Sequence, residues 1–131
     1  GDLDFLDMSL WDCFKEPEEE EFKGKTLIQH FCELERGVTR LGVAGNLRTP
    51  QDVTKALEEG VDWIMLGRAA ILHHDFPKLY EEDDQFVPSQ IPVSVDYLTQ
   101  EGLSPKFIEY MSNWGFVDGS VDRMKEAIKK A

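Results

Sequence analysis

Two glycine dipeptides of this chain carry groups that could hold a phosphate. Gly45-Asn46 and Gly67-Arg68 each follow a short apolar segment. Glycine lacks the Cβ that keeps an anion away from backbone N–H groups, and the guanidinium fork of an arginine matches phosphate oxygens. Either dipeptide alone is compatible with close strand packing and a surface cation. Their joint occurrence favours a phosphate site.

The dipeptides stand at the ends of predicted strands. Apolar runs predict strands over residues 3–11, 39–44 and 61–66, the first and the last of them buried. Helices are predicted between them, over residues 26–36 and 49–60. Strands that alternate with helices are typical of an α/β fold with a parallel sheet and right-handed crossovers. Because the carboxyl ends of parallel strands meet at one edge, one ligand could touch both dipeptides.

The chain after the last strand divides into short segments. A helix over residues 69–73 would point its free N–H groups at the edge of the sheet where the two dipeptides meet. In (β/α)-barrels, the loops after the last two strands and a short extra helix form a recurrent phosphate site. We expect barrel βα units over residues 1–80 and a C-terminal extension over 81–131. The rest of the expected pattern is irregular at 75–77 and 85–92 and helical at 105–113 and 121–130.

These residues resemble the Old Yellow Enzyme family of FMN-dependent NAD(P)H:flavin oxidoreductases. The match rests on residues 43–52 (VAGNLRTPQD), 56–62 (ALEEGVD), 65–71 (MLGRAAI) and 75–77 (DFP). It covers about residues 3–80 well. Residues 98–117 look like the C-terminal extension of some bacterial members, with weaker specificity.

The resemblance implies an FMN whose phosphate is held by Gly45, Asn46, Gly67 and Arg68. Many members carry a second glycine where this chain has Asn46, but asparagine also occurs there. In such enzymes NAD(P)H reduces the flavin, which passes a hydride to an activated, electrophilic alkene. The implied fold is the C-terminal part of a (β/α)8 TIM barrel, about strands six to eight.

Much of a barrel enzyme is missing from the chain. A complete barrel has eight strands and ~250 residues, whereas three strands are predicted here. The flavin-ring contacts and catalytic residues of the family fall in the absent part, so we expect no catalytic residue in this chain. His73 and His74 are interpreted as polar residues at a helix end. We expect the remaining N-terminal barrel half or another copy of the chain as partner, and open sheet edges covered by the C-terminal tail or by another copy.

Two other interpretations stay open. The first is another phosphate-binding barrel enzyme, such as a relative of tRNA-dihydrouridine synthase or dihydroorotate dehydrogenase, which share Gly-Arg at the last strand. The second is a non-catalytic half-barrel that binds a phosphate ligand or assembles with itself.

Composition excludes several partners. The net charge of −12 would repel nucleic acid, and this argues against the tRNA enzyme. No segment approaches the ~20 apolar residues of a membrane helix, and no secretory signal is recognised. Cys13 and Cys32 lack metal-ligand spacing and are expected to be structural thiols in a reducing cytoplasm. The run Glu18–Glu21 is interpreted as a solvated acidic surface, so no metal site is expected.

Overall fold

Three short parallel strands form the sheet. In the computed structural model, which describes residues 2–131, β1 (Phe5–Ser9), β2 (Arg40–Ala44) and β3 (Trp63–Ile64) pair in the order β1-β2-β3. Asp7 pairs with Gly42, and Gly42 pairs with Trp63. The prediction of an α/β chain with a parallel sheet is confirmed.

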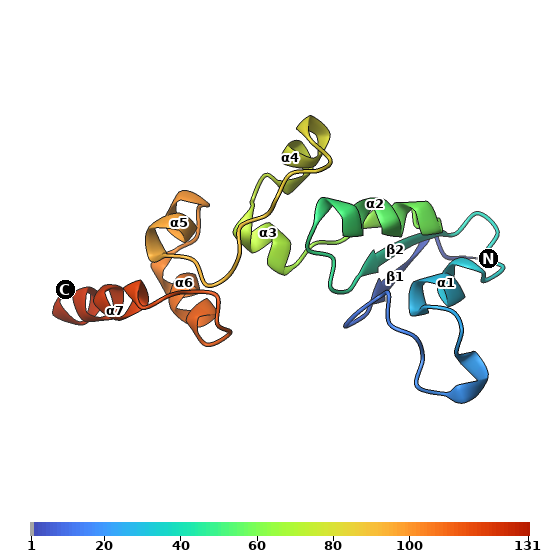
Figure 1. Ribbon diagram of the computed structural model, residues 1–131, viewed down its shortest axis with the longest axis horizontal. Helices are drawn as coiled ribbons and strands as arrows, with labels where there is room; N and C mark the ends of the chain where they lie inside the picture. Colours follow the sequence, from blue (N-terminus) through green and yellow to red (C-terminus); the bar gives the residue numbers. More distant parts are fainter. Residues whose placement is uncertain (1) are drawn as a thin grey trace.

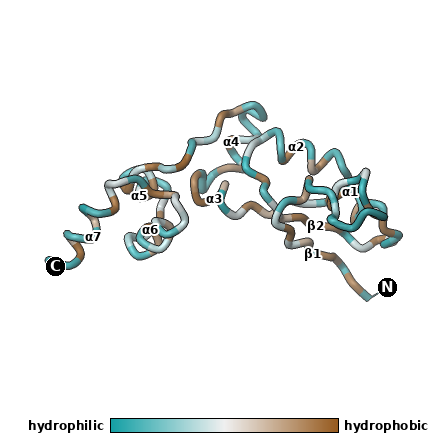
Figure 2. The backbone as a smooth tube through the Cα atoms, turned by 60° about the horizontal axis from the view of Figure 1, so that its bottom comes forward, coloured by the Kyte–Doolittle hydropathy of each residue, from teal (hydrophilic) through white to brown (hydrophobic). Residues whose placement is uncertain are grey.

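Two helices cover one face of this sheet. Helix α1 (Leu27–Cys32) connects β1 to β2, and α2 (Pro50–Glu59) connects β2 to β3. Figure 2 shows both helices on the same side of β1 and β2. Thr49 caps the start of α2, and Gly60 ends it with a φ of 110°. The core between these helices and the sheet consists of Met8, Cys13, Ile28, Leu41, Val43, Leu47, Ala56 and Val61.

The opposite face of the sheet is aromatic and open. Side chains alternate along a strand, so the pairing places Phe5, Gly42 and Trp63 together on this face. The Phe5 and Trp63 rings meet edge to face, 5.4 Å apart, and the indole occupies the space a side chain at Gly42 would need. Phe5 remains 51% exposed. Within residues 2–131, no helix packs on this face of the sheet, whereas α1 and α2 pack on the opposite face.

Two strand predictions are wrong in detail. The segment 61–66 was expected to be a strand covered on both faces, but β3 has only two residues, both half-buried. The segment 3–11 was expected to be buried, but only Met8 of β1 is. The physical reason is shared: β1 and β3 are edge strands with one neighbour each, and helices cover a single face.

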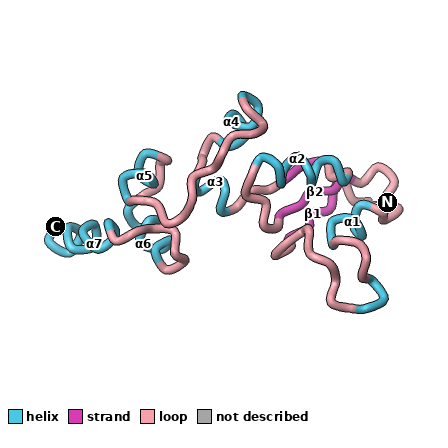
Figure 3. The backbone as a smooth tube through the Cα atoms, in the orientation of Figure 1, coloured by secondary structure: helices cyan, strands magenta, loops and turns pink. Residues whose placement is uncertain are grey.

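Two further short helices follow the sheet. Helix α3 (Arg68–Leu72) starts directly after the last dipeptide, and α4 (Phe76–Glu82) follows it. Residues 75–77 were expected to be irregular, and this is wrong because Pro77 stands in the first turn of α4, where its missing N–H costs no hydrogen bond. Figure 3 shows the chain between α4 and α5 as a long loop, which includes the predicted irregular segment 85–92.

The C-terminal part is a small helical unit. Helices α5 (Val95–Gln100), α6 (Pro105–Ser112) and α7 (Ser120–Lys130) pack around Val93, Leu98 and Ile108. Helix α5 was not predicted, although Ser94 caps it. Figure 1 shows this unit at the far end of the elongated chain from the sheet. The C-terminal tail therefore does not cover a sheet edge, contrary to one of the two expectations.

Two surface features complete the fold. The acidic run near the N-terminus contains one exposed 3-10 turn, η1 (Glu20–Phe22). None of the helices within residues 2–131 combines the length and the apolar character that crossing a bilayer requires.

Candidate functional site

One pocket brings the four predicted phosphate ligands together. It lies at the carboxyl ends of the strands and has a volume of about 250 Å³. Gly45 and Asn46 reach it from the end of β2, and Gly67 and Arg68 from the junction of β3 and α3. The sequence could predict this meeting because parallel strands end at the same edge. The remaining lining residues are Leu10, Trp11, Ala44, Leu47, Arg48 and Met65.

The packing of the protein requires a glycine at position 45. Its φ is 151°, and a Cβ at this position would lie 2.7 Å from the carbonyl oxygen of Leu10 and 3.0 Å from the amide nitrogen of Cys13. The Gly45 carbonyl accepts a hydrogen bond from the Cys13 N–H at 3.2 Å. The missing side chain therefore lets the loop after β1 approach β2, which is the packing role that the sequence left open for this glycine.

Asn46 adopts the left-handed conformation that asparagine tolerates better than most residues. Its φ is 56°, and it is the one non-glycine residue with positive φ among residues 2–131. Its Nδ2 donates to the Asp12 carboxylate over 3.3 Å. Gly45 and Asn46 both have positive φ values, and both line the pocket.

Gly67 differs from Gly45 in having open space around it. No atom lies within 4 Å of the position that a Cβ would occupy, and the residue is exposed. Its carbonyl accepts hydrogen bonds from Ala70 and Ile71 in the first turn of α3. A ligand could therefore approach the Gly67 backbone without displacing protein atoms.

Arg68 and Arg48 supply positive charge to the pocket. Both side chains are exposed, and among residues 2–131 neither guanidinium forms an ion pair or an intramolecular hydrogen bond. Arg48 was missed in the sequence, although it follows Asn46 by only two residues in the same loop. Asp52 accepts hydrogen bonds from the N–H groups of Arg48 and Thr49, both at 3.0 Å, and so fixes the loop.

The charged side chains that line the pocket are both positive. The chain contains 26 acidic residues among 131, yet in the part that the structure describes no aspartate or glutamate lines this pocket. Arg48 and Arg68 both line the pocket, and opposite charge would attract an anion to them. The arrangement therefore fits a phosphate, which could accept bonds from the guanidinium groups and from nearby backbone N–H groups.

Cys13 lies beneath this site and is unsuited to nucleophilic chemistry. Its side chain is fully buried, and burial, followed by the nearby Asp12 charge, raises the pKa of the thiol to about 11. Burial also raises the pKa of the Cys32 thiol. Both cysteines are free. A protonated thiol is a poor nucleophile and metal ligand, so both fit the structural role that the sequence predicts.

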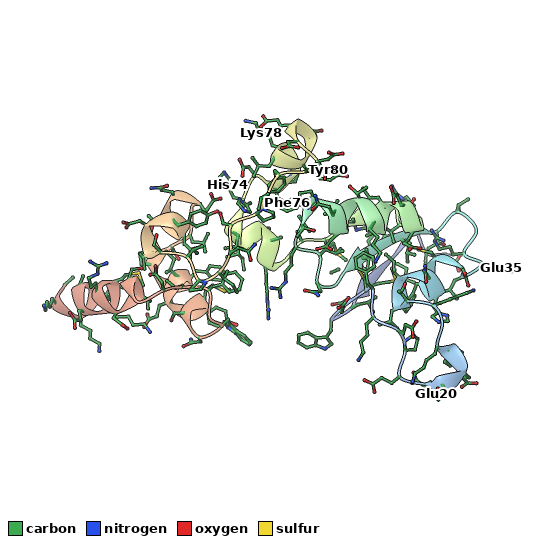
Figure 4. The ribbon with its side chains drawn as sticks, in the orientation of Figure 1. Glu20, Glu35, His74, Phe76, Lys78 and Tyr80 are labelled. Carbon is green, nitrogen blue, oxygen red and sulfur yellow. The ribbon has the colours of Figure 1, made fainter. Side chains whose placement is uncertain are left out.

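His73 and His74 hold segments together. The His73 Nε2 accepts a hydrogen bond from the Ser89 N–H at 3.0 Å, which ties α3 to the loop after α4. His74 Nδ1 lies 2.6 Å from the Glu101 carboxylate at the end of α5. Figure 4 shows His74 on the segment between α3 and α4, away from the sheet. These contacts connect α3 and the residues after it to the loop after α4 and to the end of α5.

Both members of the His74–Glu101 pair have shifted pKa values. Its hydrogen bond to Glu101 raises the pKa of His74 against a smaller opposing effect of burial. Burial disfavours the charged Glu101, but its bonds to the His74 side chain and N–H outweigh this and lower the pKa of the carboxyl. Together with Asp75, their ligand atoms lie within 4.8 Å, a spacing that could hold a metal ion, although the ion pair already satisfies His74.

Comparisons with known proteins do not identify a family for this chain. No protein-family model, no curated protein and no solved structure matches it.

Proposed function

We propose that this chain is the C-terminal part of an FMN-dependent NAD(P)H oxidoreductase barrel of the Old Yellow Enzyme kind, and that it supplies the site for the FMN phosphate. The observation that carries the proposal is the pocket in which Gly45, Asn46, Gly67 and Arg68 meet at the carboxyl ends of two neighbouring parallel strands. In (β/α)-barrels, phosphate sites occur at this end of the last two strands.

The open face of the sheet supports an incomplete barrel. Parallel sheets occur almost only with both faces covered. Here α1 and α2 pack on one face, whereas Phe5 of β1 and Trp63 of β3 lie on the other, and within residues 2–131 the outer edge of β1 has no strand partner. Further strands of a barrel would pair with that edge and enclose the aromatic face, so the remaining N-terminal half is the partner that this surface fits.

The residues at the pocket fit the phosphate end of FMN. Arg68 would form charge-assisted hydrogen bonds to the phosphate, each worth ~1.5–3 kcal/mol. The backbone at Gly67 is open to a ligand, and Asn46 is an exposed residue of the same pocket. Bound FMN would supply hydride transfer between NAD(P)H and an activated alkene. No residue of this chain is assigned a catalytic role, because its histidines and cysteines are engaged in structural contacts.

The test of this function uses the complete protein to which the chain belongs. We expect purified protein to be yellow and to reduce cyclohexenone with NAD(P)H. A yellow protein without this turnover would favour a different flavin barrel, such as a dihydroorotate dehydrogenase relative. A colourless protein that takes up no FMN would contradict the proposal.

A second function is favoured by the same open sheet. A non-catalytic half-barrel could enclose its aromatic face against another copy, since two such faces would exclude water from Phe5 and Trp63. Sedimentation equilibrium of the 131-residue chain separates the two cases. A dimer that Phe5→Ser dissociates supports self-assembly, and a monomer at all concentrations rejects it.

A further inference from the structure

A tryptophan reaches the phosphate pocket from the third strand of the sheet. Trp11 follows the end of β1 and lines the pocket together with Gly45 and Arg68. Because β1, β2 and β3 are parallel neighbours, their carboxyl ends meet at one edge, and each of these ends supplies residues to the same pocket. The proposed phosphate site uses the ends of β2 and β3 and leaves Trp11 without a role.

The backbone on both sides of Trp11 is tied to the end of β2. The Leu10 N–H donates a hydrogen bond to the Ala44 carbonyl at 2.9 Å, and the Cys13 N–H donates to the Gly45 carbonyl at 3.2 Å. Trp11 lies between these two contacts. The position of its backbone relative to the pocket is therefore fixed by hydrogen bonds to a neighbouring strand.

The indole of Trp11, in contrast, is uncovered. It is 94% exposed, which makes it the most exposed of the three tryptophans. The Trp63 ring packs against Phe5, and the Trp114 ring lies 6.3 Å from that of Tyr110. A large aromatic side chain left in water forgoes the stabilisation that burial would give. A fixed backbone with an uncovered ring beside a pocket is suited to packing on a ligand.

The lining of the pocket combines two kinds of surface. Arg48, Gly67 and Arg68 provide charge and open backbone, whereas Leu10, Leu47 and Met65 provide carbon surface in addition to the indole. A free phosphate would use the polar groups alone. The apolar lining fits a ligand that joins a phosphate to a large apolar or aromatic group.

We propose that Trp11 packs its indole on the isoalloxazine ring of the FMN whose phosphate is bound at Gly67 and Arg68. The indole is electron-rich and the isoalloxazine is electron-poor, so offset stacking of the two planes is favourable. Trp11 is then a positioning residue, which orients the ring system and is not itself a catalytic group. This inference rests on the proposed FMN-binding function and extends it, because it assigns a flavin-ring contact to this chain.

The experiment measures FMN and riboflavin binding to the complete protein by flavin fluorescence. Riboflavin carries the same ring system without the phosphate. Trp11→Ala should weaken the binding of both ligands by about 10-fold and should raise the fluorescence of bound FMN, because a stacked indole quenches the flavin. Trp11→Phe keeps an aromatic ring and should bind both ligands more tightly than Trp11→Ala.

Two further variants provide the controls. Trp114→Ala removes the other strongly exposed tryptophan, which lies outside this pocket, and should leave both affinities within about twofold. Arg68→Ala should weaken FMN binding and leave riboflavin binding unchanged, because riboflavin has no phosphate for the guanidinium to bind.

The outcomes separate this inference from the proposed function. If Trp11→Ala leaves FMN affinity and the fluorescence of bound FMN unchanged while Arg68→Ala weakens FMN binding, Trp11 does not contact the ring and the phosphate clamp stands. If Trp11→Ala weakens FMN but not riboflavin, Trp11 acts on the phosphate end and the inference is wrong. A complete protein that binds neither flavin contradicts both proposals.

Discussion

Thr49 and Asp52 form a capping box at the start of α2, in which each side chain accepts a hydrogen bond from the backbone N–H of the other residue. The Asp52 N–H donates to the Thr49 hydroxyl at 3.1 Å, and the Thr49 N–H donates to the Asp52 carboxylate at 3.0 Å. The same carboxylate binds the Arg48 N–H. The capping box therefore stabilises the start of α2 and also the backbone of Arg48, which lines the pocket.

Thr49→Ala should lower the free energy of unfolding by about 1 kcal/mol, because the Asp52 N–H loses its acceptor. Urea denaturation followed by circular dichroism measures the change. Thr49→Ser keeps the hydroxyl and serves as the matched control, with stability close to that of the unchanged chain. Equal losses for the alanine and serine variants would show that the hydroxyl does not act as the cap.

The two glycines of the site should respond differently to alanine. Gly45→Ala should destabilise the chain by about 1–3 kcal/mol, because its backbone conformation disfavours a side chain and its Cβ would press on Leu10. Gly67→Ala meets no protein atom and should change stability far less. Thermal unfolding gives the comparison. If Gly67→Ala is the more damaging of the two, the open approach to its backbone is wrong.

These glycines also show what a sequence can reveal about a site. The alternation of apolar strands and capped helices was sufficient to predict that residues 45–46 and 67–68 meet at one sheet edge. The sequence pattern does not show that Gly45 packs tightly against the loop after β1 while Gly67 is open to a ligand, because the path of that loop is not visible in a local pattern. Arg48 was missed for a related reason: its direction depends on the sharp turn at Asn46.

Strand lengths were predicted poorly because they depend on neighbours that a local pattern does not show. The apolar run at 61–66 is compatible with a strand buried on both faces, but only Trp63 and Ile64 pair with β2. Helix α4 was missed because residues 75–77 were expected to be irregular, whereas a proline such as Pro77 is compatible with the first turn of a helix.

The contact between His74 and Glu101 predicts a pH dependence of stability. The pKa of His74 is raised above its ordinary 6.5, so its contribution is complete below pH 6.5 and is lost as pH rises through the raised pKa. The pKa of Glu101 is lowered below 4.5, so its contribution is complete above pH 4.5 and is lost as pH falls through the lowered pKa. The pair therefore stabilises most between these two values.

NMR titration of His74 checks this pH dependence. Its midpoint should lie above 6.5 and should fall toward that value in Glu101→Gln, which removes the charge and keeps a hydrogen-bonding group. An unchanged His74 midpoint in Glu101→Gln would contradict the assignment.

Cys13 should be unreactive in the folded chain. Its burial and a pKa of about 11 leave almost no thiolate at pH 8. In a Cys32→Ser background, we expect no reaction with a disulfide reagent under native conditions and complete reaction of one thiol in urea. Rapid labelling of the native chain would show that the loop between β1 and α1 opens readily.

The effect of Arg68→Ala on FMN binding tests the phosphate clamp most directly. Loss of one charge-assisted contact should weaken FMN binding about 10- to 100-fold in calorimetry of the complete protein. Arg40→Ala, which changes the net charge equally at the opposite end of β2, should leave the affinity within about twofold. Retention of full FMN affinity by Arg68→Ala would contradict the assignment of this pocket to the phosphate.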